Sequence, residues 1–153
     1  MNRRFDAIVI GAGQAGPPMV GRLAAAGQKV ALIERKLIGG TCVNVGCTPT
    51  KAMVASAYAA HLARRGADFG VNVGKVGVDF AAVMSRKNTI VGDSRSHLTA
   101  WLRDMANCTL LEGQARFLSP TTVRVGDDTL EASASSSMWA VARRRPIFLV
   151  ATR

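Results

Sequence analysis

Cys42 and Cys47 are the residues whose type and spacing most directly suggest chemistry, because they are two thiols separated by only four residues. Pro49 is suited to the first turn of a helix, where its missing N–H is no loss, and the apolar run from Ala52 predicts that the helix continues. Cys47 is therefore expected just before a helix N-terminus, where the helix dipole and free backbone N–H groups stabilise a thiolate. Cys42 lies in a glycine-rich approach and can fold back to pair with it. The segment predicts thiol–disulfide exchange.

Residues 39–51 resemble the redox-active disulfide signature of the class I pyridine nucleotide-disulfide oxidoreductases, and most of all its mercuric reductase-like members. The match covers both cysteines, the glycine pair, Asn44, Gly46, Pro49 and Lys51. The resemblance implies that Cys47 is the thiol beside a flavin and that Cys42 exchanges with the substrate. It also implies that Lys51 lies near the flavin N5, and that Gly40 and Thr41 contact the cofactor.

Two other interpretations of the cysteines stay open, a zinc site and inert thiols. Structural zinc usually takes four Cys or His ligands at spacings such as Cys-x2-Cys. The three cysteines, His61 and His97 offer no such spacing, so we predict no metal site. Cys108 begins a short apolar segment and is interpreted as a buried hydrophobic thiol.

A glycine-rich segment near the N-terminus predicts a dinucleotide-binding unit. The apolar residues 5–10 suit a buried parallel strand, and a helical stretch over residues 15–26 follows. Between them lie Gly11, Gly13 and Gly16. The first permits a tight turn, the second lets the backbone approach a pyrophosphate, and the third allows the helix to pack closely on the strand.

Glu34 ends a second predicted strand, residues 29–34, and follows Gly16 by 18 residues. An acid at this position is placed to bind ribose hydroxyls. In the family that the chain resembles, the N-terminal unit holds FAD and the NAD(P) fingerprint comes later. The resemblance therefore implies FAD as the cofactor and NAD(P)H as the electron donor. A βαβ unit with an unused glycine turn is the alternative interpretation.

The middle of the chain predicts a long helix over residues 79–105, followed by strands over residues 109–117 and 122–125. His61 and His97 fall on predicted helices and are interpreted as surface or packing residues rather than catalytic bases.

Family members have a Gly-x-Ala segment that meets the FAD adenine. The resemblance assigns this contact to Gly113 and Ala115, and a plain strand is the alternative interpretation.

The composition changes abruptly at Ala132. All 10 acidic residues precede it, whereas residues 132–153 contain four arginines and show neither a strand nor a helix pattern. The family has a strand like Ile-Phe-Leu-Asn-Val-Gly-x-Arg here, and a shifted frame through the single-codon residues Met138 and Trp139 encodes Val-Gly. We infer a frameshift near Ala132, in the gene or in its sequencing.

Residues 132–153 are therefore expected to form a disordered or loosely packed tail. Removal of residues 133–153 is expected to change stability by no more than about 0.5 kcal/mol. The arginines have no aromatic interleaving or recognition motif, so we do not predict a nucleic-acid partner.

The rest of the chain is typical of a globular domain. At 153 residues, with 48% hydrophobic and 20% charged content, it can bury an ordinary core. No apolar run reaches membrane-spanning length and no signal-peptide core precedes the first strand, so we expect a cytoplasmic protein without a membrane partner. The expected fold class is α/β, a truncated Rossmann-like FAD-binding domain with a parallel sheet, over residues 1–131.

Two functions follow from the resemblance. The first is an FAD-dependent disulfide oxidoreductase, in which electrons pass from NAD(P)H through FAD to Cys42 and Cys47 and on to a small-molecule disulfide or a metal ion. The full-length family adds an NAD(P) domain, a returning FAD segment and a dimerisation domain, so this chain is expected to be catalytically incomplete and not to reproduce the homodimer. The second is a non-catalytic remnant that binds FAD or an adenine nucleotide.

Overall fold

The computed structural model describes residues 1–137, with side chains through Ala132. A six-stranded sheet in the order β3-β2-β1-β6-β5-β4 forms its base. The strands are β1 (Asn2–Ile10), β2 (Val30–Glu34), β3 (Cys108–Glu112), β4 (Ala115–Phe117), β5 (Thr122–Val125) and β6 (Asp128–Ser137). The pairs β3–β2, β2–β1 and β1–β6 are parallel, whereas the pairs β6–β5 and β5–β4 are antiparallel. The expected α/β class with a parallel sheet is confirmed.

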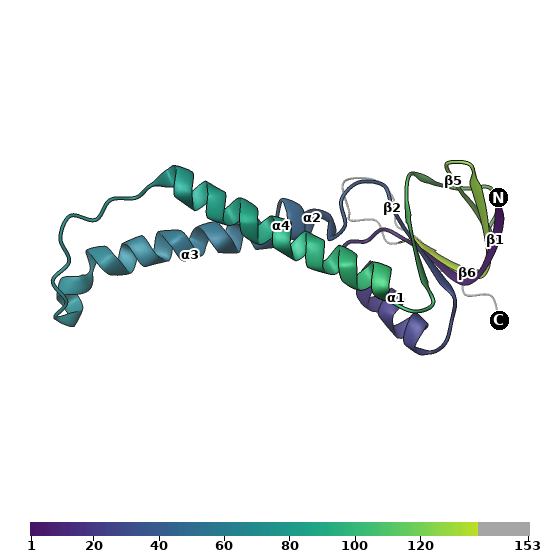
Figure 1. Cartoon of the computed structure of the whole chain (residues 1–153), viewed down its shortest axis with the longest axis horizontal. Coiled ribbons are helices and arrows are strands. Elements are labelled where there is room, and N and C mark those ends of the chain that lie inside the picture. The colour runs from purple at the N-terminus through teal and green to yellow at the C-terminus, as the bar shows by residue number, and fades with distance from the viewer. Residues whose placement is uncertain (138–153) are drawn as a thin grey trace.

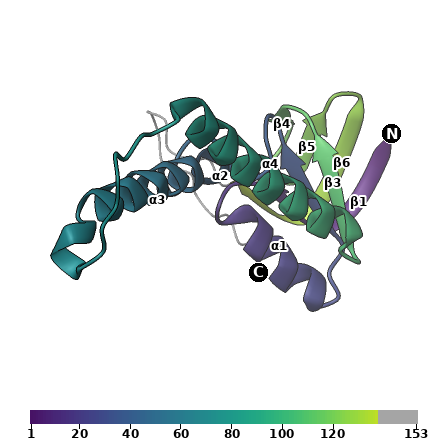
Figure 2. The same ribbon diagram turned by 60° about the vertical axis from the view of Figure 1, so that its left-hand side comes forward.

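One face of the sheet is covered by helices. The helices are α1 (Gly16–Ala25), α2 (Gly40–Asn44), α3 (Cys47–Arg64) and α4 (Phe80–Asp104), with a short 3-10 turn η1 (Gly66–Phe69). Figure 2 shows α1 and the C-terminal part of α4 against this face. There Val20 of α1 and Leu102 of α4 are fully buried with Val9 and Leu32 of the sheet. Burial of such side chains stabilises the unit by about 1.5–3 kcal/mol each.

The opposite face has a second apolar cluster. Phe5 and Ile8 of β1 pack there with Val123 of β5 and Leu130 of β6. β1 is thus buried on both faces over Ala7 to Ile10, as the apolar run predicts for a central parallel strand, whereas Asp6 is exposed.

Helices α3 and α4 run side by side and extend away from the sheet (Figure 1). Asp79 caps α4, since its Oδ1 accepts a hydrogen bond from the Ala82 N–H at 3.0 Å. On α4, Arg86 donates from Nη1 to the carbonyl oxygen of Ala52 in α3, at 3.0 Å. The predicted helix over residues 79–105 is confirmed, and no helix of the described residues combines the length and apolar composition needed to cross a bilayer.

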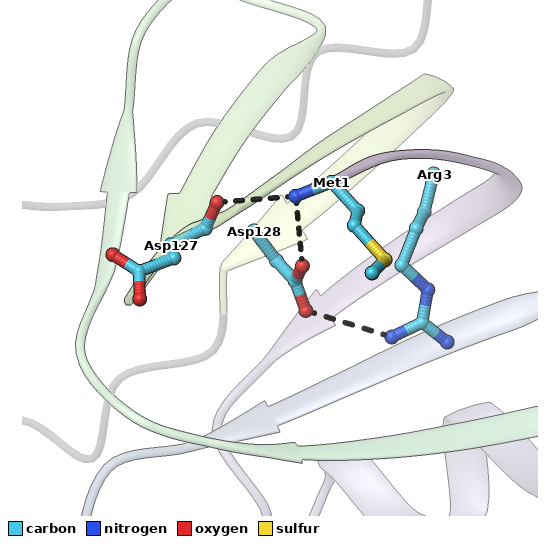
Figure 3. A network of polar contacts seen from close by, with 4 residues as sticks. All are labelled: Met1, Arg3, Asp127 and Asp128. Atoms are coloured by element: carbon cyan, nitrogen blue, oxygen red, sulfur yellow. Dashed lines mark hydrogen bonds and ion pairs between the residues drawn. The ribbon is translucent and has the colours of Figure 1, made fainter.

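The N-terminus is tied to the start of β6. The Met1 ammonium lies 3.2 Å from Oδ1 of Asp128, and Arg3 lies 3.8 Å from Oδ2 of the same carboxylate (Figure 3). The ammonium also donates to the Asp127 carbonyl oxygen at 3.3 Å. These exposed contacts mark where β1 and β6 begin to pair, and each is worth no more than about 1 kcal/mol.

Strand β6 differs from the expectation for the C-terminal segment. The boundary expected at residues 131 and 132 falls inside β6, which continues to Ser137, with Ala134 to Ser137 paired in parallel to Ala7 to Ile10. Strand pairing uses backbone groups, so a serine-rich segment can occupy this position without an apolar pattern. Residues 138–153, where the rest of the expected tail falls, lie outside the described residues.

Candidate functional site

The glycine turn between β1 and α1 requires two of its three predicted glycines for steric reasons. Gly11 has a φ of 106°, a conformation that favours glycine, and its N–H donates to the Ile33 carbonyl oxygen at 2.7 Å. A Cβ at Gly16 would lie 2.0 Å from the Gly11 carbonyl oxygen. The first glycine thus makes the turn, and the third lets α1 start directly against it.

Glu34 stands at the end of β2 beside this turn. Its Oε2 accepts from the Ala12 N–H at 2.8 Å, and its Oε1 accepts from the Lys36 N–H at 2.9 Å. Its carbonyl oxygen accepts from the Gly113 N–H at 2.9 Å. The carboxylate is therefore fixed at the carboxyl ends of the parallel strands, where ligands bind in open α/β sheets.

A cavity of about 410 Å³ opens at this edge of the sheet. Its walls bring together seven of the predicted cofactor-binding residues, namely Gly11, Gly13, Glu34, Gly40, Thr41, Gly113 and Ala115. Gly16 lies behind the turn, and Cys42, Cys47 and Lys51 are not among the lining residues. The sequence therefore identified residues that share one cavity, but it did not predict that the thiols lie outside its lining.

Other lining residues were not predicted. Ile10, Ile33, Arg35, Lys36, Leu37, Asn44, Val45 and Gln114 complete the wall. Most are sequence neighbours of predicted residues at the ends of β1, β2 and β3. Their position at the carboxyl ends of parallel strands is the signal that could have identified them.

The segment with the two cysteines, residues 39–51, packs directly on the glycine turn. A Cβ at Gly40 would lie 2.8 Å from the Gly13 Cα, and Gly40 has a φ of 57°. The Gly39 N–H donates to the Ala12 carbonyl oxygen at 2.8 Å. By contrast, a Cβ at Gly13 would meet no atom of the protein within 4 Å. The space beside the Gly13 backbone is therefore unfilled by protein, and Gly13 lines the cavity.

The two predicted redox cysteines are adjacent. Cys42 lies in the short helix α2, which was not predicted, and Cys47 is the first residue of α3 rather than the residue before it. Both are free thiols, Cys42 half-buried and Cys47 exposed. A side-chain hydrogen bond with Cys47 raises the pKa of Cys42, burial adds to this, and the nearby Lys51 ammonium acts in the opposite direction. The geometry places the Cys42 thiol of α2 beside the Cys47 thiol and the Lys51 ammonium of the first turns of α3.

Asn44 lies between the cysteines and organises α2. Its side-chain nitrogen donates to the carbonyl oxygens of Ile38, at 3.0 Å, and Gly40, at 2.8 Å. Its Oδ1 accepts from Nη1 of Arg95 on α4, at 3.3 Å. Arg95 carries no motif in the sequence and was not predicted, because a partner 51 positions away in the chain has no local signal.

The remaining titratable candidates lie apart from this site. His61 and His97 are exposed on α3 and α4, as expected, and Cys108 is half-buried at the start of β3, where burial raises its pKa. Within residues 1–137, no group of three or more His, Cys, Asp and Glu side chains could hold a metal ion.

The cavity fits the adenosine diphosphate part of FAD. Gly13 leaves room for a phosphate beside its backbone, Glu34 offers a fixed carboxylate to ribose hydroxyls, and Gly113 and Ala115 line the same cavity. Gly16 lets the N-terminus of α1 approach the same turn.

Comparison with known proteins agrees with this geometry. The chain is 38% identical over 129 residues to dihydrolipoyl dehydrogenase of Chlamydia muridarum, covering 84% of this chain and 28% of that protein. It is 34% identical over 131 residues to mercuric reductase of Bacillus cereus, covering 86% and 21%. The chain thus spans less than a third of these relatives.

Solved structures and a family profile extend the comparison. The Cu(II) complex of the HOCl-induced flavoprotein disulfide reductase RclA from Escherichia coli matches with a TM-score of 0.74 and 31% identity, over 94% of this chain and 30% of that one. The profile of the pyridine nucleotide-disulphide oxidoreductases matches residues 5–134. The chain therefore belongs to the pyridine nucleotide-disulphide oxidoreductase family.

Proposed function

We propose that this chain provides the FAD-binding and dithiol part of a disulfide oxidoreductase. The observation that carries the proposal is the packing of Gly40 on Gly13, because it joins the cysteine segment to the predicted diphosphate-binding turn. Bound FAD would supply two-electron transfer between a nicotinamide and the thiols. Gly11, Gly13, Gly16, Glu34, Gly40, Thr41, Gly113 and Ala115 would hold it.

The thiols would perform exchange with the substrate. Cys42 would lose its proton and attack one sulfur of a substrate disulfide, and the other substrate sulfur would leave as a thiol. Cys47 would then attack the Cys42 sulfur and release the second substrate thiol. Two electrons and two protons thus pass from the cysteines to the substrate, and a disulfide between Cys42 and Cys47 remains. The hydrogen bond with Cys47 and burial raise the pKa of Cys42, and the ammonium of Lys51 acts in the opposite direction, so exchange by Cys42 should be faster at higher pH.

The substrate, partners and compartment belong to the same proposal. The names of the relatives include mercuric reductase and a Cu(II) complex. We therefore propose two substrate classes, a small-molecule disulfide or a metal ion. We also propose NAD(P)H as the electron donor and a cytoplasmic location, with the homodimer belonging to the full-length family.

A second candidate is a non-catalytic unit that binds FAD or an adenine nucleotide. It is favoured by one observation, that the cavity is lined by nucleotide-binding candidates and not by Cys42 or Cys47.

Binding of FAD to the purified chain tests the proposal. We expect saturable binding with ADP as a competitor, measured by flavin fluorescence and equilibrium dialysis. Glu34→Gln should weaken FAD binding about tenfold, because the substitution disturbs a carboxylate held by two backbone N–H groups. Glu131→Gln is the matched control, since Glu131 is exposed and pairs with Arg4 outside the cavity.

Three results are informative. Folded protein that binds neither FAD nor ADP would contradict both candidates. Binding of FAD together with reversible oxidation of Cys42 and Cys47 supports the oxidoreductase. Binding of ADP and FAD without that oxidation supports the remnant.

A further inference from the structure

Helix α4 contacts both helices that carry the thiols. Arg95 donates to Asn44 of α2 at 3.3 Å. Nearer the start of α4, Arg86 donates to the Ala52 carbonyl oxygen of α3 at 3.0 Å and to Ser56 Oγ at 3.3 Å. Because Cys42 belongs to α2 and Cys47 to α3, α4 contacts both thiol-bearing segments (Figure 1).

The contact with α2 determines the orientation of one amide. The Asn44 side-chain nitrogen serves two carbonyl oxygens, those of Ile38 and Gly40, so its oxygen is left as the acceptor for Arg95. A guanidinium has only donors, so it favours this orientation and disfavours the flipped one. The half-buried Arg95 thereby stabilises the amide that closes the turn leading into α2.

The short helix has few stabilising features of its own. α2 has five residues, has no side-chain cap and contains no buried residue. An isolated helix of this length is unstable in water. The position of Cys42 relative to Cys47 therefore depends on the contacts that α2 makes with its surroundings.

We propose that Arg95 is a positioning residue for the dithiol, which acts through Asn44 to hold Cys42 within reach of Cys47 and so favours their disulfide. This inference rests on the proposed function. The physical reason is that a covalent bond already restrains the disulfide state, whereas the dithiol state is restrained only by packing. Loss of the Arg95 contact therefore frees the dithiol more than the disulfide, and makes oxidation of the pair less favourable.

Equilibration of the full chain with glutathione buffers tests the inference without a flavin. Each oxidation passes two electrons and two protons from the Cys42 and Cys47 thiols to glutathione disulfide, which becomes two glutathione thiols. Trapping with an alkylating agent and mass spectrometry give the oxidised fraction. We expect Arg95→Met to lower the equilibrium constant about tenfold, and Arg95→Lys, which keeps a donor, to lower it less.

Two comparisons separate positioning from general loss of stability. Arg103→Met removes another α4 guanidinium, one paired with the exposed Glu112, and should leave the equilibrium constant unchanged. In an Asn44→Ala background, Arg95→Met should have no further effect, because the residue through which it acts is gone.

The outcomes are distinguishable. If the wild type, Arg95→Met and Arg95→Lys form the disulfide with the same equilibrium constant, the inference is overturned and the proposed function stands. The inference would also be overturned if Arg103→Met lowered the equilibrium constant as much as Arg95→Met does. The same holds if Arg95→Met lowered it equally in the wild-type and Asn44→Ala backgrounds. A wild-type chain that forms no disulfide between Cys42 and Cys47 would overturn the inference and the proposed function together.

Discussion

Cys42 and Cys47 have different surroundings although they are close in the chain. Cys47 is exposed at the first position of α3, and Cys42 is half-buried in α2. Their shared hydrogen bond raises the pKa of Cys42, which therefore keeps its proton to a higher pH than an ordinary thiol. A redox pair with distinct roles for its thiols is consistent with this asymmetry.

The pH dependence of Cys42 alkylation tests this asymmetry. In Cys47→Ala, the largest cause of the raised pKa of Cys42 is absent, so its pKa should fall and its thiolate fraction at about pH 8 should increase. We expect faster alkylation of Cys42 by iodoacetamide in this variant than in the wild type, measured by peptide mass spectrometry over a pH series. Cys108→Ala should leave the Cys42 profile unchanged. An unchanged or slower rate in Cys47→Ala would argue against the hydrogen bond.

Residue types and spacing alone predicted the tight turn at Gly11 and the close approach at Gly16, whereas the ligand-binding roles of the glycines and Glu34 stay predictions. Their roles follow from local rules: a tight turn, a close helix approach and an acid at a strand end. Arg95 and the orientation of Asn44 could not be predicted in this way, because they depend on how α4 packs against α2 in three dimensions. The roles of Cys42, Cys47 and Lys51 at a flavin stay predictions.

At the scale of elements, the unit β1, α1 and β2 depends on one close approach. A Cβ at Gly16 would lie 2.0 Å from the Gly11 carbonyl oxygen, so Gly16→Ala should lower the free energy of unfolding by about 1–3 kcal/mol. The methyl group of Gly13→Ala would meet no protein atom within 4 Å, so the free energy of unfolding of this variant should stay within about 0.5 kcal/mol of the wild-type value. Urea unfolding measures both.

The same pair of variants separates folding from binding. Gly13→Ala places a methyl group where the proposed function puts the FAD diphosphate, so we expect it to weaken FAD binding while leaving the fold intact. Equal stability losses in the two variants would refute the steric account of the turn.

Strand β6 makes a prediction about truncation. Deletion of residues 138–153 leaves all of β6 in place, whereas deletion of residues 133–153 removes the backbone that pairs with Ala7 to Ile10 of β1. We now expect the longer deletion to be the more destabilising, in contrast to the small effect predicted from composition. Thermal unfolding of the two truncated chains decides this. Equal stabilities would show that the serine-rich end of β6 contributes nothing to the sheet.

Most elements followed from hydrophobic pattern and capping residues. The long helix α4 was predicted because apolar residues recur at helical spacing, and the structure adds the Asp79 cap, which was not predicted. α2 was missed because five residues without a side-chain cap have no pattern. The end of β6 was missed because its serines show no apolar alternation, and its place is set by pairing with β1. The frameshift inferred from the codons stays a prediction.

At the scale of the whole molecule, the cavity, the dithiol and α4 form one unit within residues 1–137. The chain spans 28% of the dihydrolipoyl dehydrogenase that it matches. We therefore expect no NADH- or NADPH-dependent reduction of disulfides or dyes by this chain, even at saturating FAD. Steady-state assays against a Cys47→Ser control measure this. Turnover above that control would mean that a nicotinamide site exists which the described residues do not reveal.

The central claim is that Cys42 and Cys47 are a redox pair placed beside a nucleotide site. Disulfide mapping of air-oxidised protein by mass spectrometry tests it most directly, because Cys42 and Cys47 share one tryptic peptide, residues 37–51, whereas Cys108 lies on another, residues 104–116. The account predicts a link between Cys42 and Cys47, with Cys108 free at the start of β3. A link from Cys108 to either of the other two would contradict the claim.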